Sequence, residues 1–316
     1  MAPLLILGMV NHLVDALFDD VADAAIERIF QAALPIALAC LHFVLLATCV
    51  WTLVYQPLGI ASKFALFFAY TLYFAHVSNA VGHELIHRTK KLPFNLGKWL
   101  FISILFGHHT SSHRLIHHPY VATRYDPNTA RYGENFYRFF WRAWRGSFLA
   151  GLGAENQRLG YPPNSRAVDV KNPYFTYIIG AFAFMALAAA FAGWSGLLIY
   201  LTLAFSAQAG LLLTDYTQHY GLTRPEAADG TFPPIAPHHS WNAPHWFTRK
   251  LTLNAPLHSD HHAKPARPFT ELQTHPQETA PQLPYSPGIM SMIALHPPRW
   301  RKIMHPRVAE WAMRHR

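Results

Sequence analysis

The sequence has 316 residues, enough for one large domain or two small ones. Apolar residues make up 51% of it and charged residues only 14%, about half the charged share of ordinary soluble domains, so the composition indicates an integral membrane protein with a polar part. The net charge is +9, but the chain has no zinc-finger cysteines, no RNA-recognition signature and no basic run with interleaved aromatic residues, which argues against nucleic acid as a partner.

The N-terminal third predicts two membrane crossings. Residues 1–29 mix apolar and acidic positions, which predicts a short amphipathic or interfacial segment without a secretory signal. Residues 30–54 carry no charge and are long enough to cross a bilayer. Residues 58–82 predict a second crossing, with Lys63 near its start, and a proline-glycine turn separates the two.

The middle of the chain predicts surface segments followed by two more crossings. Residues 99–107 are apolar but too short to cross alone, so a re-entrant or interfacial segment is expected. Residues 136–160 place arginines among aromatic residues and predict an amphipathic surface helix. Residues 174–192 and 196–214 predict the third and fourth crossings. The rest of the chain is too rich in proline for elements to be predicted.

The expected fold is an all-α integral membrane protein with about four transmembrane helices in two hairpins and a cytoplasmic histidine-rich cap. Of the 26 Lys and Arg residues, all except Arg28 and Lys63 lie in two polar regions, 83–172 and 215–316. An excess of cations marks the cytoplasmic face, so both regions are expected there, within a single domain over residues 1–316.

Nine histidines in four groups are the candidate metal ligands. They are His83 and His87; His113, His117 and His118; His219; and His258, His261 and His262. Residues at i and i+4 share a helix face, so His83 and His87 can hold one ion. His113 and His117 have the same spacing, whereas His118 sits about 100° round the helix and is expected to face a second ion.

The last group, His258, His261 and His262, has i, i+3 and i+4 spacing and is expected on one helix face. His219 ends the fourth crossing and approaches from another direction. Imidazole suits iron, copper and zinc, and nine ligands are too many for one ion, so two ions are predicted.

Residues near the groups are expected to support them, and no catalytic residue is predicted beyond the ligands. Candidates to orient ligating imidazoles are Glu84, Asp126, Glu134, Asp260 and His245; the alternative for the carboxylates is a simple surface charge. Candidates to line a substrate channel from the lipid are Phe64, Phe67, Phe68, Tyr73 and Phe74; the alternative is that these rings face lipid or pack within the protein.

Two other functions stay open at this point. HELIH, residues 83–87, also matches the HExxH pattern of an intramembrane zinc protease with Glu84 as base, although a hydrolytic zinc takes about three protein ligands and leaves the other histidines unexplained. A metal transporter is expected to place charged residues within its crossings, which are nearly free of charge here.

The histidine groups resemble those of the integral-membrane non-haem di-iron family, and within it of the alkane 1-monooxygenases. The motifs that carry the resemblance are HELIHR (83–88), HRLIHH (113–118), HYG (219–221) and HSDHHA (258–263). Flanking stretches, among them 121–139, also resemble the family. The sequence departs from the family pattern at Ser112, Asp215, Gln218, Pro256 and Leu257, and it begins late, without a first hairpin that would make six crossings.

The resemblance implies two irons held by the nine histidines, dioxygen activation and hydroxylation of a hydrophobic substrate, first of all the terminal carbon of an alkane. A related fatty-acyl, terpenoid or aromatic hydroxylase or desaturase is the alternative. It also implies a bacterial-type inner membrane, histidines facing the cytoplasm, and a rubredoxin or ferredoxin-type donor with its reductase. An external donor agrees with the chain itself, which has two cysteines and no nucleotide-binding motif.

Overall fold

The computed structural model describes residues 24–162 and 165–314, so the amphipathic segment expected at 1–29 lies almost wholly outside the described residues. Within the described residues the chain forms helices and no strands, apart from one isolated bridge between Asn242 and Gln282, which confirms the all-α prediction. The elements are α2 (Ala24–Tyr55), α3 (Ile60–Leu72), the π-helix η1 (Tyr73–Ser78), α4 (Asn79–Ile86), α5 (Lys91–Ser103), α6 (His109–Ser112), the π-helix η2 (His113–His117), α7 (His118–Tyr120), α8 (Phe136–Arg158), α9 (Pro173–His219), the short helix η3 (Pro237–His239), α10 (Trp246–Leu251), α11 (His258–Ala263), the short helix η4 (Phe269–Glu271), α12 (Pro287–Ala294) and α13 (Pro297–Arg314).

Three helical stretches in the described residues are long and apolar enough to cross a membrane: Ile29–Tyr55, Ile60–Ile86 and Pro173–His219. The second is continuous through α3, η1 and α4. At most a third of the residues in the most apolar window of each stretch are buried within the protein, so their apolar side chains largely face outward. A helix with this exposed apolar surface is stable when lipid covers it.

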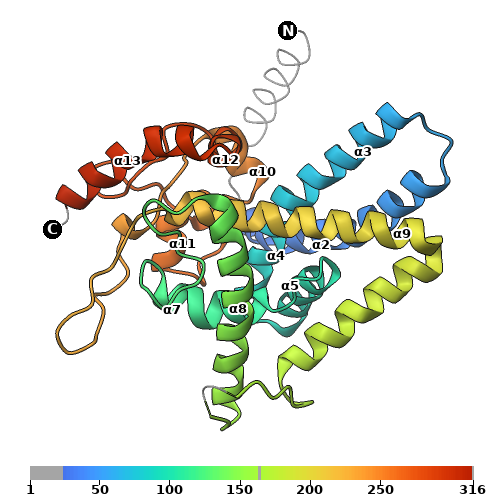
Figure 1. The fold of residues 1–316 in the computed structure, drawn as a ribbon, viewed down its shortest axis with the longest axis horizontal. Coiled ribbons are helices and arrows are strands. Elements are labelled where there is room, and N and C mark those ends of the chain that lie inside the picture. Colours follow the sequence, from blue (N-terminus) through green and yellow to red (C-terminus); the bar gives the residue numbers. More distant parts are fainter. Residues whose placement is uncertain (1–23, 163–164, 315–316) are drawn as a thin grey trace.

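The longest of these helices, α9, is bent near its middle into two legs (Figure 1). Ala192 leaves helical geometry, and Gly193 adopts φ 60° and ψ −159°, a conformation open essentially only to glycine. The bend lies between the crossings expected at 174–192 and 196–214. Each leg approaches the roughly 20 residues that a crossing needs.

The short apolar segment expected at 99–107 forms the second half of α5 and the turn after it. Helix α5 packs on α2, α4 and α9, and its residues Leu100, Phe101 and Ile102 are buried by these neighbours. The approach to α4 is close because Gly97 has no side chain: a Cβ atom there would lie 2.7 Å from the Cβ of Leu85. Helix α5 therefore covers one side of α4 at the end that carries His83.

The predicted amphipathic helix at 136–160 is α8, which crosses the second leg of α9 steeply (Figure 1). The Asn135 side chain caps its start by accepting a hydrogen bond from the Arg138 amide at 3.0 Å. Phe136, Phe139 and Phe140 are buried, two of them against Tyr216, while Trp141 on the outer face is 63% exposed.

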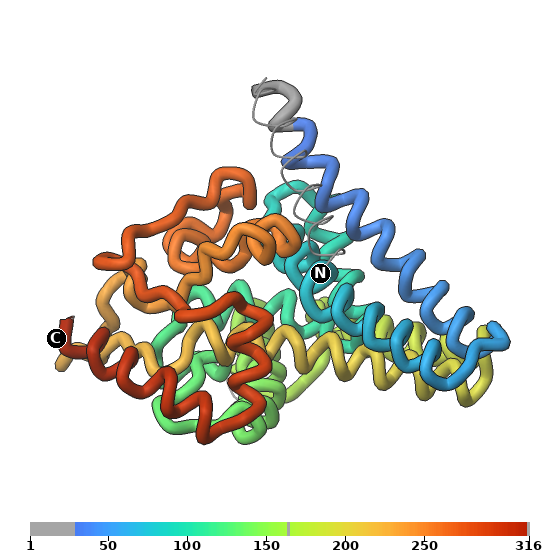
Figure 2. Tube along the Cα trace, turned by 90° about the horizontal axis from the view of Figure 1, so that it is seen from above, coloured from blue at the N-terminus to red at the C-terminus, as the bar shows by residue number. Residues whose placement is uncertain are grey.

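The region after α9 folds over the ends of the crossings as a cap of short helices joined by loops (Figure 2). Helix α11 is pinned there because Asn242 and Ser259 exchange two hydrogen bonds, of 2.6 and 2.9 Å. Helices α10 and α11 have only six residues each, too few to show a helical period, which is why the sequence pattern predicts no elements here.

Candidate metal centre

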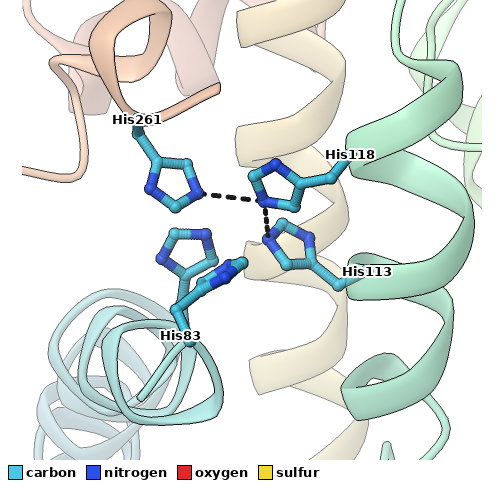
Figure 3. Close-up of side chains that lie close together, drawn as sticks. His83, His113, His118 and His261 are labelled. Carbon is cyan, nitrogen blue, oxygen red and sulfur yellow. Dashed lines mark hydrogen bonds between the residues drawn. The ribbon is translucent and has the colours of Figure 1, made fainter. Parts of the chain in front are cut away.

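The structure brings all nine histidines together in two neighbouring groups. The first group is His83, His87, His113, His118 and His261, and the second is His117, His219, His258 and His262. Within each group, the candidate ligand nitrogens all lie within 4.8 Å of one another. Figure 3 shows the first group, where side chains from α4, from the α6–α7 helix and from α11 point toward one centre.

The placement of HRLIHH differs from the prediction. His118 joins His113 in the first group, and His117 belongs to the second. The reason is that His113–His117 is π-helical: the His118 amide donates to the carbonyl of His113, five residues back. A π-turn puts residues i and i+5 on one face, whereas the predicted pairing of His113 with His117 assumed an α-helix.

Helix α11 serves both groups, which also differs from the expectation of one shared face. His258 and His262 are four residues apart and belong to the second group, whereas His261 belongs to the first. The helix lies between the groups, so that neighbouring residues on it point to different centres. His83 and His87 lie in one group, as their spacing predicts.

The contacts among these imidazoles fit bound metal ions better than hydrogen bonds. The Nε2 atom of His118 lies 3.0 Å from Nε2 of His113 and 3.1 Å from Nε2 of His261. Nε2 of His258 likewise lies 2.9 Å from Nε2 of His219 and 3.1 Å from that of His262. A ring nitrogen carries either one proton or one lone pair, so it cannot satisfy two such neighbours at once.

One ion in each group resolves these contacts. Two nitrogens bound at a right angle, each about 2.1 Å from an ion, lie about 3.0 Å apart. The Nε2 atoms of His83, His87 and His117, which belong to the same groups, are buried without a hydrogen-bond partner. The donor sets of five and four nitrogens therefore suit metal ions, and the first exceeds the four donors of tetrahedral structural zinc.

Burial keeps most of these imidazoles in the form that binds metal. Burial, reinforced by neighbouring imidazoles, holds the pKa well below its usual value in His87, His113, His118, His258, His261 and His262. These side chains are neutral at pH 7, as metal coordination requires. His117 is the exception: burial lowers its pKa, but the carboxylate of Asp126 more than offsets this, and the net pKa is raised.

Asp126 holds His117 in place. Its Oδ2 atom lies 2.9 Å from Nδ1 of His117 and accepts a hydrogen bond from the Thr129 hydroxyl at 2.6 Å. Its Oδ1 atom accepts from the Asn128 amide at 2.9 Å. Because Nδ1 of His117 is paired with Asp126, Nε2 of His117 remains free for a metal. A carboxylate behind a ligating histidine is the usual arrangement at metal sites.

Three further residues support this arrangement and were not predicted from the sequence, namely Asn128, Thr129 and Asp215. The Asn128 side chain donates to Asp215 at 2.6 Å and so ties the loop after α7 to α9. Both Asp126 and Asp215 are buried. The Asp-Pro-Asn-Thr sequence of this loop carries the signal, because an Asp that accepts the amide two residues on is typical of a turn.

The other residues expected to orient imidazoles have different partners. Glu84 accepts from Arg88 and from the Phe269 amide, and Asp260 accepts from Arg267 at 2.6 Å. Each lies one residue from a histidine of the first group, about 100° round the helix, and therefore points away from that group.

Glu134 and His245 also lie outside the two groups. Glu134 forms a two-pronged ion pair with Arg142, at 2.7 and 2.8 Å, and Arg142 in turn donates to the carbonyl of Thr129 at 3.0 Å. Glu134 thus supports the loop that carries Asp126. His245 lines a separate surface pocket with Arg307.

A cavity of about 90 Å³ adjoins both histidine groups. It is lined by His83 and His113 of the first group and His258 of the second. Its other walls come from η1, α4, α6, α9, α10 and the loops around α11 and α12; the residues are Ala75, His76, Asn79, Ala80, His109, Leu211, Thr214, Asp215, Thr217, Gln218, Ala243, Thr248, Thr252, Ala255, Pro256, Leu283 and Pro287. A small molecule or the end of a chain placed there touches both candidate centres.

None of the five aromatic residues expected to line a channel borders this cavity. Phe64 and Phe67 line a separate outer groove with Lys63. Phe74 is fully buried and packs edge-on against His42.

Comparison with known proteins places the chain in a family. The sequence model of the family described as "Fatty acid desaturase" matches residues 59–294, three quarters of the chain. Alkane 1-monooxygenase 2 of Alcanivorax borkumensis is 32% identical over 72% of this chain and 59% of its own length. Alkane 1-monooxygenase of Ectopseudomonas oleovorans is 32% identical over 86% of this chain and 67% of its own length.

A third relative, the xylene/toluene monooxygenase hydroxylase component XylM of Pseudomonas putida, is 28% identical over 74% of this chain and 62% of its own length. The chain spans about three fifths of the length of several of these relatives. The comparisons agree with the resemblance carried by the four histidine motifs. The chain belongs to the fatty acid desaturase family, together with the alkane 1-monooxygenases.

Proposed function

We propose that this chain is a membrane di-iron monooxygenase that uses dioxygen and externally supplied electrons to hydroxylate a hydrophobic substrate, first of all the terminal carbon of an alkane. The observation that carries the proposal is the pair of adjacent groups of five and four imidazoles beside one cavity. The groups abut closely: the rings of His118 and His262, one from each group, have centroids 4.6 Å apart.

Iron is the proposed metal because the donors are nitrogens only and one group offers five of them. Imidazole suits iron, zinc and copper, but five donors exceed a tetrahedral set. One iron is held by His83, His87, His113, His118 and His261, and the other by His117, His219, His258 and His262. When bound, the two irons supply the activation of dioxygen.

The chain supplies position and a dry environment. Asp126 fixes the ring of His117, and the buried neutral imidazoles keep the centre free of bulk water. The cavity is far smaller than the several hundred Å³ of a pocket that encloses a whole drug-sized ligand, so it holds the reacting end of a chain and leaves the rest among the crossings. This small volume supports oxidation at the end of a chain.

For the topology we propose four crossings in two hairpins within one domain over residues 1–316. The bend at Gly193 supports this count, because it divides α9 at the position where the sequence predicts a turn. The cations of 83–172 and 215–316 support a position of the histidine groups on the cytoplasmic side of a bacterial-type inner membrane.

Electrons come from outside the chain, since the two cysteines cannot hold an iron–sulfur cluster. We propose a rubredoxin or ferredoxin-type donor with its reductase. The net charge of +9 favours an acidic donor, because complementary charge speeds encounter.

A second candidate substrate is an aromatic side chain, which the similarity to XylM favours; fatty-acyl or terpenoid hydroxylation or desaturation is the wider alternative. The zinc-protease hypothesis is disfavoured, because the carboxylate of Glu84 is engaged by Arg88 and Phe269 and is not free to act as a base.

The proposal is tested by a product screen with purified protein. Iron-loaded protein, a rubredoxin or ferredoxin with reductase, dioxygen and a series of alkanes should yield 1-alkanols by mass spectrometry. Benzylic alcohols from methylbenzenes, without 1-alkanols from alkanes, would favour the second candidate. No oxygenated product from any substrate class, with iron bound and the donor turning over, would reject both.

A further inference from the structure

The last two helices of the chain form an unusual pair. Residues 283–295, which contain α12, carry no charged residue, whereas α13 directly after it carries a run of cations. On α12, Met290, Ile293 and Ala294 face inward and are buried. Its outer side is apolar as well: Met292 is 67% exposed, and Ile289 and Leu295 are also exposed. A helix that is apolar on all sides needs a cover for its outer face.

We propose that α12 and α13 form a membrane-interface anchor, with the outer face of α12 inserted at the level of the lipid headgroups and the cations of α13 bound to anionic phospholipid. Both helices lie in the region expected to be cytoplasmic, and the anchor does not depend on which reaction the centre performs.

The position of α12 favours lipid as the cover. Helix α12 packs directly on α9, which is one of the three helices long and apolar enough to cross the membrane. The views of Figures 1 and 2 place it beside the end of α9 that enters the cap. Its exposed apolar face therefore lies beside a helix that is long and apolar enough to cross the membrane.

Exposed aromatic residues lie on the segments next to α12. The Tyr137 hydroxyl of α8 donates to the carbonyl of Leu295, at the end of α12, at 2.8 Å. Tyr137 and Trp141 of α8 and Tyr285 before α12 are all exposed. Tyr and Trp are enriched where membrane proteins meet the headgroup region, which is the environment these rings fit.

The charge of α13 selects the kind of lipid. Arg299, Arg301, Lys302 and Arg307 are exposed, and none of them makes an ion pair within residues 24–162 and 165–314. The inner side of the helix is fixed, because Trp300, Met304 and Val308 are buried. Free cations beside an inserted apolar helix attract anionic headgroups, and each one near the surface strengthens binding by about fivefold.

The anchor bears on the cavity, since Leu283 and Pro287 line the cavity wall. A hydrophobic substrate that moves laterally in the membrane thus meets α12 next to the cavity. The anchor fixes the depth of this wall relative to the lipid.

The test places a nitroxide spin label on the outer face of α12 in the full-length chain. Met292→Cys is labelled in a Cys40→Ser, Cys49→Ala background and reconstituted into phosphatidylcholine–phosphatidylglycerol vesicles. Phe64→Cys, on the exposed apolar face of α3, is the lipid reference, and Ala228→Cys, in an exposed polar loop, is the water reference. Ile289→Cys gives a second label on α12.

The expected result is high collision with oxygen and low collision with a water-soluble nickel chelate at both α12 positions, close to the Phe64→Cys values. Nickel access equal to that of Ala228→Cys would overturn the proposal. Low access to both reagents would also overturn it, because a protein partner or a second copy would then cover α12.

The charge is tested with Arg301→Glu combined with Lys302→Glu. The Met292 label should lie deeper in vesicles with phosphatidylglycerol than in pure phosphatidylcholine, and the double variant should lose most of this difference. An equal depth of the native-charge protein in both lipids would overturn the role of anionic lipid.

Discussion

His118 and His113 are five residues apart, yet their Nε2 atoms lie 3.0 Å from each other. The π-helical turn at His113–His117 makes this approach possible, and it sends His117 to the opposite group. One short segment thereby supplies both candidate centres. The division of the ligands between the centres depends on this turn, because an α-helical turn would exchange the roles of His117 and His118.

Substitution of these neighbours should therefore affect different ions. His118→Ala removes a ligand of the five-histidine group, and His117→Ala removes one of the four-histidine group. Each variant should retain about half of the wild-type iron, and their Mössbauer spectra should differ from each other. Identical spectra for the two variants would show that the histidines share a centre.

Asp126→Asn should weaken the second centre without unfolding the protein. The amide keeps the shape but loses the charge that orients His117, and loss of such a partner typically costs 10–100-fold in metal affinity or activity. Iron retention during chelator titration measures the effect. Asp169→Asn, on the surface and remote from the histidines, is the control and should titrate like the wild type.

Filling the cavity should slow turnover without loss of metal. Thr214 lines the cavity on α9, and Thr214→Phe places a ring there. Thr202 lies on the same helix, faces outward and, like Thr214, bonds the carbonyl four residues back, so Thr202→Phe is a matched control. We expect kcat/KM to be at least about tenfold lower for Thr214→Phe, which corresponds to a barrier increase of about 1.4 kcal/mol. The iron content of the variant should equal that of the wild type. An equal loss of kcat/KM in both variants would show that the cavity is not where the substrate reacts.

The crossing of α4 and α5 should be sensitive to a single methyl group. In Gly97→Ala the new Cβ would lie 2.7 Å from the Cβ of Leu85 and 2.9 Å from the carbonyl oxygen of Gly82, so the helices must separate. Overpacking of this kind costs about 1–3 kcal/mol. Thermal unfolding in detergent should show a lower Tm, whereas Gly59→Ala, with open space around its Cβ position, should leave Tm near that of the wild type.

The sequence predicted the helical fold because long uncharged runs have few alternatives in a membrane. It also identified the nine histidines that the structure brings together, since their spacing repeats. The division of the histidines could not be predicted in the same way. An α-helical period was assumed for HRLIHH, and nothing in the local spacing of His113, His117 and His118 reveals a π-turn.

The partners of the nearby carboxylates depend on long-range packing. Glu84 meets the amide of Phe269, which is 185 residues away in sequence, and Asn128 meets Asp215, 87 residues away. No local pattern encodes such contacts. Only Asp126, nine residues from His117 and within a recognisable turn, combines a local signal with contact to the centre.

Metal analysis of protein expressed with ample iron, combined with Mössbauer spectroscopy, decides whether the nine histidines hold two irons. We expect two irons per chain in nitrogen-rich sites, and in His261→Ala a loss of iron together with loss of hydroxylated product. One zinc per chain and no iron would contradict it.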